Sequence, residues 1–247
     1  MLLFLPGLIC DARIYAPQLA AFPASRAVDG YGMAGSLEAM ARVALAQADR
    51  EGAERFDLFG HSMGGRVALE VYRLAPRRVR RLALSSTGIH PVAEQEPAKR
   101  AALKAIGHDH GFAALVDVWL PPMVAEANRA RPIYREMREM SLDQGQALFD
   151  TQIGALLGRP DVRGLLPEIA CPTLVITGEL DEWSPPAQHR EIAAAIPDAS
   201  LVIVPGAGHM LPLEAPAAVN AAIADWLARP ADEHLLPTQP PYERQPS

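Results

Sequence analysis

The stretch DLFGHSMGG, residues 57–65, holds a serine, Ser62, with one glycine two residues before it and another two residues after it. An apolar strand pattern leads into the stretch and a helical pattern leads out of it. A strand that turns directly into a helix leaves no space for a Cβ near the turning residue, and Gly60 and Gly64 remove that obstacle. We therefore expect Ser62 at the tip of a sharp turn. There, free backbone N–H groups at the start of the helix favour a developing negative charge.

Two later strand patterns end in the residues that would activate such a serine. A serine hydroxyl needs a base to remove its proton, and the base needs an acid that fixes its tautomer. The apolar run 173–177 leads into a loop that contains Asp181, and the run 201–204 leads into a glycine-rich loop that ends in His209. The chain order serine, acid, histidine predicts that Ser62, Asp181 and His209 are the catalytic residues of an enzyme that attacks carbonyl carbon.

The acid has two alternatives in the same loop. Glu182 is adjacent to Asp181 and is the nearer alternative, and Glu179 is the other. The strand that ends near Ser85 is followed by no carboxylate, which removes another common position for the acid.

Two backbone N–H groups are expected to bind a substrate oxyanion, one from the loop after the first strand and one from the residue after the serine. The first apolar run, residues 2–5, is followed by a tight loop, and Leu8 in that loop can offer its N–H. Met63 directly follows the serine and can offer a second N–H. Leu8 and Met63 are therefore the predicted oxyanion hole.

Composition excludes several classes of partner. The chain has 247 residues, of which 49% are hydrophobic, and a formal net charge of −6. Phosphate binding needs a basic surface, so nucleic acid is not an expected partner. No apolar run approaches the ~20 residues that span a bilayer, and the first ten residues lack the basic start of a signal peptide. Two isolated cysteines fit a reducing compartment, so we expect a cytoplasmic protein that acts on a small-molecule substrate.

Short apolar runs alternate with helical patterns, which is typical of a parallel sheet with helices on both faces. The expected strands are 2–5, 26–29, 56–59, 82–85, 173–177 and 201–204.

This alternation stops between about residues 90 and 168, where only helical patterns occur. The expected helices are 94–106, 112–120, 132–140 and 142–157. A helical insertion between two strands predicts a lid over the carboxyl edge of the sheet, where ligands bind in such folds. Residues 230–247, rich in proline and polar side chains, are expected to form a disordered tail.

Several other titratable residues are expected to be structural. The run His108-Asp109-His110 has the residue types of a metal site but lacks a further ligand, so we predict a solvated loop and no metal. His61 is expected to point away from Ser62, and Glu214 to serve the N-terminus of the last helix.

Residues 59–65, 178–181 and 206–209 resemble the corresponding motifs of the alpha/beta-hydrolase superfamily, in its small, lidded, single-domain members. The resemblance covers residues 2–228. It implies a single domain over residues 1–229 with an alpha/beta-hydrolase fold: a mostly parallel sheet of about six strands, helices on both faces, a helical lid, and the family's two leading strands absent. Such proteins hydrolyse esters, related acyl bonds or certain carbon–carbon bonds without a cofactor. Pro6 stands where many relatives have a histidine, which alters the hydrogen bonding of the oxyanion loop.

The resulting expectation is a serine esterase that cleaves a carboxylic ester of a small to medium apolar substrate through an acyl-enzyme. The residues predicted to line its pocket are apolar or aromatic, and they are Ile9, Phe112, Trp119, Met123, Met137, Met140 and Trp183.

Two alternatives remain open. One is a carbon–carbon bond hydrolase of the ring-cleavage-product type, in which Arg129, Arg131 or Arg135 would hold a substrate carboxylate. The other is a non-hydrolytic ligand receptor on the same fold.

Overall fold

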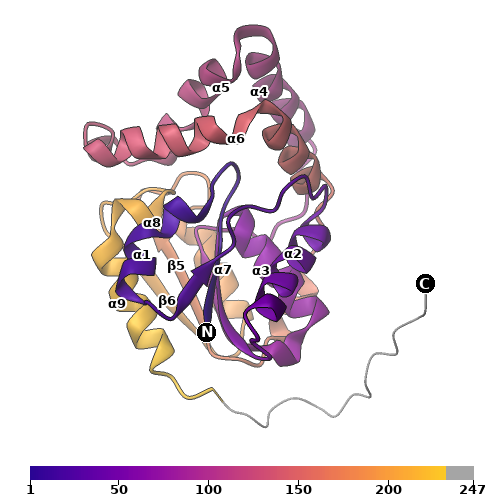
Figure 1. Cartoon of the computed structure of the whole chain (residues 1–247), viewed down its shortest axis with the longest axis vertical. Helices are drawn as coiled ribbons and strands as arrows, with labels where there is room; N and C mark the ends of the chain where they lie inside the picture. Colours follow the sequence, from indigo (N-terminus) through magenta and orange to yellow (C-terminus); the bar gives the residue numbers. More distant parts are fainter. Residues whose placement is uncertain (232–247) are drawn as a thin grey trace, which may run out of the picture.

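The computed structural model describes residues 1–231, and its centre is a six-stranded parallel sheet with the strand order β2-β1-β3-β4-β5-β6 (Figure 1). The strands are β1 (Leu2–Leu5), β2 (Ser25–Ala27), β3 (Phe56–His61), β4 (Val79–Ser85), β5 (Thr173–Gly178) and β6 (Ala199–Val204). All six expected strands are present, and the alpha/beta-hydrolase fold predicted from the motifs is confirmed. Of the predicted tail, residues 232–247 lie outside the described residues.

Helices cover both faces of the sheet, which explains why its strands are almost continuously apolar. Figure 1 shows α1 and α9 together on one side and α2 and α3 on the other. The helices outside the insertion are α1 (Ala16–Ala21), α2 (Leu37–Arg50), α3 (Met63–Leu74), α7 (Pro186–Ala195), α8 (Leu211–Glu214) and α9 (Pro216–Leu227). Within residues 1–231, no helix combines the length and the apolar character needed to cross a membrane.

One aromatic cluster of the core lies where β1 and β3 meet the 3₁₀ turn Ala12–Tyr15. The ring of Phe4 stacks on Tyr15 with centroids 4.6 Å apart, and both rings contact Phe59. These three side chains are fully buried. They fix the positions of β1 and β3, the two strands that lead into the oxyanion loop and into Ser62.

A helical insertion, defined here as residues 96–157, lies over the carboxyl edge of the sheet (Figure 1). It contains α4 (Glu96–His110), α5 (Phe112–Trp119) and α6 (Pro132–Leu157). The two helices expected at 132–140 and 142–157 form α6, which is interrupted at Gly145, where φ is 75°. The prediction of a loop at residues 108–110 is wrong, because these residues form the last turn of α4. In that turn, His108 Nε2 lies 2.8 Å from Asp150 Oδ2.

Polar contacts fasten the insertion to the loop that follows β1. The N–H of Ile9 donates to Gln152 Oε1 at 2.8 Å, and both residues are buried. Farther along the loop, Arg13 pairs with Asp143 at 2.7 Å. Contacts from α6 therefore support the loop in which Leu8 lies.

Candidate active site

Ser62 is the only residue between β3 and α3, and its backbone has φ 56° and ψ −119°. Few residues other than glycine adopt a positive φ, and such strain is concentrated at functional positions. The two glycines of the motif make the turn possible. A Cβ on Gly60 would lie 2.3 Å from the carbonyl oxygen of Gly64, and a Cβ on Gly64 would lie 2.1 Å from that of Leu5.

Gly64→Ala is expected to lower the free energy of unfolding by about 3 kcal/mol or more, because the added methyl meets backbone atoms that cannot rotate away. Urea denaturation at neutral pH measures the change. Gly35→Ala is the matched control, because a Cβ there meets nothing within 4 Å. The control should change stability by less than about 0.5 kcal/mol, and equal losses in both variants would contradict the steric argument.

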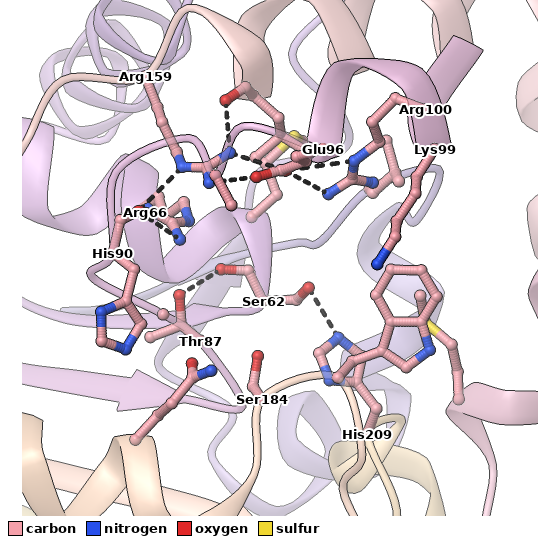
Figure 2. Close-up of a pocket in the computed structure, with 18 of the residues that line it drawn as sticks. Ser62, Arg66, Thr87, His90, Glu96, Lys99, Arg100, Arg159, Ser184 and His209 are labelled. Atoms are coloured by element: carbon pink, nitrogen blue, oxygen red, sulfur yellow. Dashed lines mark hydrogen bonds and ion pairs between the residues drawn. The ribbon is translucent and has the colours of Figure 1, made fainter. Parts of the chain in front are cut away.

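The structure brings Ser62, His209 and Asp181 into one chain of hydrogen-bonding distances. His209 Nε2 lies 2.8 Å from Ser62 Oγ (Figure 2), and His209 Nδ1 lies 3.0 Å from each carboxylate oxygen of Asp181. An anionic carboxylate can only accept, so the proton of a neutral imidazole resides on Nδ1. Nε2 is then free to accept the hydroxyl proton of Ser62.

Asp181 is held as an anion by its surroundings. It is buried, and its Oδ1 accepts backbone N–H groups from Trp183 at 3.0 Å and Ser184 at 2.8 Å. Burial acts to raise the pKa of this carboxyl, but the charge and hydrogen bond of His209 and the N–H of Ser184 outweigh it and leave the pKa of Asp181 below its usual range. Of the two alternative acids, Glu182 is exposed and Glu179 accepts the N–H of Gly206.

Glu214 supports the loop that carries His209, which differs from the role expected for it. Its Oε2 accepts the N–H groups of Gly208 and Ala125 and the side-chain amide of Asn128. The expectation that Glu214 serves the last helix is wrong, because its side chain turns back from the end of α8 and accepts all three of these hydrogen bonds.

Leu8 and Met63 both line the cavity that contains Ser62. Among residues 1–231, the backbone N–H of neither residue donates to another protein atom. The carbonyl groups that precede Leu8 are held by two buried tyrosines, since Tyr15 donates to Leu5 O at 2.6 Å and Tyr31 to Pro6 O at 3.1 Å. Sequence reasoning missed these tyrosines, which support the loop that contains Pro6.

Besides His209, two buried histidines lie close to the turn at Ser62, and both are neutral. His61 Nδ1 lies 3.4 Å from Ser85 Oγ, and burial lowers the pKa of His61 well below its usual value. His189 Nε2 accepts the N–H of Thr87 at 3.1 Å, and Thr87 in turn donates its hydroxyl to Ser62 O. Burial lowers the pKa of His189 to about 4.

Stability is expected to fall as the pH decreases from about 6.5 to about 4. In this window the unfolded chain protonates His189 whereas the folded chain does not, and the shift is equivalent to about 3 kcal/mol. The free energy of unfolding, measured by urea denaturation across this range, should depend less steeply on pH in His189→Gln than in the wild type. An unchanged slope would show that His189 does not carry the effect.

The cavity beside Ser62 has a volume of about 520 Å³. Of the predicted pocket residues, Met123 and Trp183 line it, and Trp119 lines a small adjoining cavity that also touches Ser62. The other four predicted residues do not line either of these two cavities and pack in or against the hydrophobic core, and they are Ile9, Phe112, Met137 and Met140.

The cavity wall is more cationic than the sequence suggested. Its lining includes Arg66, Lys99, Arg100 and Arg159, with Glu96 as the only carboxylate among the described lining residues (Figure 2). Arg66 follows Ser62 by one helical turn, so its place could have been inferred, whereas the others depend on how the insertion packs.

The three arginines named for a substrate carboxylate do not line this cavity. Arg129 donates to Val124 O, Arg131 to Asn128 Oδ1, and Arg135 lies 3.8 Å from Glu139. In the part of the chain that the structure describes, no group of three His, Cys, Asp or Glu side chains could hold a metal ion.

The chain is similar to known proteins in both sequence and fold. Residues 2–222 match the model of the alpha/beta hydrolase family. A curated protein of Caulobacter sp. (strain K31) that bears the name carbamate hydrolase RutD is 30% identical over 184 residues, which are 73% of this chain and 68% of that protein.

Two solved structures share the fold over 92% of this chain. A thermophilic esterase from Thermogutta terrifontis, solved with malate bound, is 28% identical with a TM-score of 0.83 over 88% of its own chain. An enol-lactonase from Burkholderia xenovorans LB400 is 25% identical with a TM-score of 0.81 over 91% of its own chain.

Proposed function

We propose that this protein, which belongs to the alpha/beta hydrolase family, cleaves a carboxylic ester through an acyl-enzyme formed on Ser62. The observation that carries the proposal is the continuous contact from Ser62 Oγ through His209 to Asp181, with distances of 2.8 and 3.0 Å. This arrangement supplies the nucleophile, the base and the acid that orients the base, which together carry out the proton transfers of acyl transfer.

In the acylation step, Ser62 Oγ attacks the ester carbonyl carbon while its proton moves to His209 Nε2. Asp181 stabilises the imidazolium that forms, because its carboxylate is anionic and contacts Nδ1. Collapse of the tetrahedral intermediate breaks the bond to the leaving oxygen. His209 returns the proton to that oxygen, so the first product departs as an alcohol.

Deacylation repeats these proton transfers with water in place of the serine. His209 removes a proton from the water as it attacks the acyl carbon, and then protonates Ser62 Oγ as the acid departs. The enzyme returns to its starting protonation state, and one water is consumed for each ester.

We assign the stabilisation of the negative charge on the tetrahedral intermediate to the backbone N–H groups of Leu8 and Met63. Both residues line the cavity at Ser62, and both N–H groups are free of protein acceptors within residues 1–231. A donor at such a position is worth about 3 kcal/mol to the transition state.

Gln152→Leu is expected to lower kcat about tenfold with little change in KM, because Ile9 loses its hydrogen-bond acceptor and Leu8 is no longer held in place. Steady-state kinetics on a p-nitrophenyl ester measures both constants. Thr151→Val is the matched control: Thr151 precedes Gln152 in α6, and its hydroxyl contacts only Ala147 O. Equal kcat values in the two variants would rule out this role for Gln152.

The proposed function is tested by fluorophosphonate labelling followed by a p-nitrophenyl ester series. The expected result is stoichiometric labelling on Ser62 and turnover of at least one ester. Labelling at another residue, or none, would overturn the assignment of the nucleophile. Labelling without turnover of any acyl substrate would favour the non-hydrolytic receptor.

Carbon–carbon bond hydrolysis is the second candidate, and the cationic wall of the cavity is the observation that favours it. The same three residues serve that reaction, and a carboxylate on a ring-cleavage product would find positive charge near Ser62. Turnover of a vinylogous diketone acid, with no turnover of any ester, would select this candidate.

A further inference from the structure

We propose that the cavity selects substrates that carry a carboxylate in addition to the reacting carbonyl, and that Arg66 and Lys99 bind this carboxylate. The proposal rests on the proposed function in that Ser62 marks the reacting end of the cavity. It departs from the apolar substrate expected from the sequence.

The first argument is the distribution of charge. The chain as a whole carries a net charge of −6, yet four cationic side chains and a single carboxylate line this one cavity. A concave site lined by one sign of charge concentrates ligands of the opposite sign. The wall is therefore suited to an anion and unsuited to a purely apolar acyl chain.

The second argument is that the single carboxylate is already occupied. Glu96 accepts two hydrogen bonds from Arg159, at 2.5 and 2.8 Å, and two from Arg100, at 3.2 and 3.4 Å (Figure 2). Arg159 also donates to the carbonyl oxygens of His90 and Leu156. Arg100 and Arg159 thus build the wall around Glu96, and neither of the other two cations forms a hydrogen bond or ion pair with this carboxylate among the described residues.

Of the cations that line the cavity, Arg66 would gain most from an anionic ligand. It is mostly buried, and its hydrogen bonds within residues 1–231 are two long ones, each 3.4 Å, to His90 O. Burial, together with the neighbouring charge of Arg159, lowers the pKa of Arg66 to about 9. A guanidinium prefers to hold a carboxylate through two parallel hydrogen bonds, and such a ligand would offset its burial.

Lys99 supplies a second contact from the insertion. It lines the same cavity, and Figure 2 shows its side chain directed into the cavity on the side of Ser62 and His209. Lys99 forms no ion pair with any described residue. Arg66 on α3 and Lys99 on α4 therefore approach the cavity from the two elements between which a ligand would lie.

The spacing sets the shape of the substrate. Arg66 follows Ser62 by four residues, which corresponds to about 6 Å along a helix axis. A carboxylate at Arg66 would then lie only a few bonds from a carbonyl at Ser62. Half-esters of short dicarboxylic acids fit this description, and we use the half-ester of succinate as the probe.

The test compares mono-p-nitrophenyl succinate with p-nitrophenyl butyrate, two esters that differ in the terminal carboxylate. For the wild type, the ratio of kcat/KM for the anionic ester to that for the neutral ester is expected to exceed about 10. In Arg66→Met this ratio should fall about 30-fold, the amount expected for one charged hydrogen-bonded pair. A wild-type preference for the neutral ester, or a ratio that does not change in Arg66→Met, overturns the proposal.

Two further variants distinguish a loss of carboxylate binding from a loss of folding. Lys99 is exposed, so Lys99→Met should fold, and it is expected to lower the same ratio about fivefold. Arg135→Met is the matched control, because Arg135 is on the insertion but outside the cavity, and it should leave the ratio unchanged. An equal fall in Lys99→Met and Arg135→Met would assign the effect to general electrostatics and overturn the proposal.

Binding without turnover separates this proposal from the proposed function. Glutarate is titrated calorimetrically into Ser62→Ala and into Ser62→Ala combined with Arg66→Met, with an expected 30-fold weakening in the double variant. Binding that depends on Arg66 supports carboxylate recognition even if no ester is cleaved. Ester turnover without glutarate binding keeps the proposed function and removes the carboxylate site.

Discussion

Ser62→Ala is expected to lower kcat on a p-nitrophenyl ester by a factor on the order of 10⁶ and to leave KM nearly unchanged. The reason is that the acyl-enzyme route requires the hydroxyl, and His209 has no other nucleophile within hydrogen-bonding distance among the described residues. The residual rate would come from water attack assisted by the oxyanion donors. Kinetics with protein purified apart from any wild-type enzyme measures the loss.

The control for this variant is Ser200→Ala, which removes a hydroxyl on β6 that contacts only backbone and Arg229. It should retain wild-type kcat. Circular dichroism should be the same for both variants. Retention of more than about one hundredth of the activity in Ser62→Ala would eliminate Ser62 as the nucleophile.

Asp181→Asn is expected to lower kcat by about 10⁴. An asparagine amide directed at His209 Nδ1 favours the tautomer with the proton on Nε2, and that tautomer cannot accept the proton of Ser62. The amide also lacks the charge that stabilises the imidazolium. Steady-state kinetics at the pH optimum of the wild type checks the size of the effect.

Glu182→Gln is the matched control, because Glu182 is adjacent in the chain and exposed. It should keep kcat within about twofold of the wild type. Full activity in Asp181→Asn, together with a large loss in Glu182→Gln, would transfer the role of the acid to Glu182.

The sheet and the turn at Ser62 could be predicted because they depend on local sequence. Apolar runs fixed the strands, and the clash that a Cβ would cause at Gly60 or Gly64 follows from the backbone alone. The same holds for Asp181 and His209, since residues that follow neighbouring parallel strands meet at one edge of the sheet.

The lining of the cavity could not be predicted in this way, because it depends on how the insertion packs. Met137 and Met140 have the composition expected of a pocket, but both are buried within the insertion. Arg159, which follows the end of the insertion, pairs with Glu96 at its start. Contacts between segments so far apart in the sequence leave no periodic signal in either segment.

The hydrogen bond from Ile9 to Gln152 bears on how such an enzyme can be re-engineered. A graft that replaced the insertion to change the substrate would also replace the acceptor for a buried N–H next to Leu8. Without an equivalent acceptor, the new chimera would carry an unpaired donor that costs about 1–3 kcal/mol. Replacing the insertion therefore affects turnover as well as selectivity. A transplanted insertion needs a glutamine, or another hydrogen-bond acceptor, at the position of Gln152.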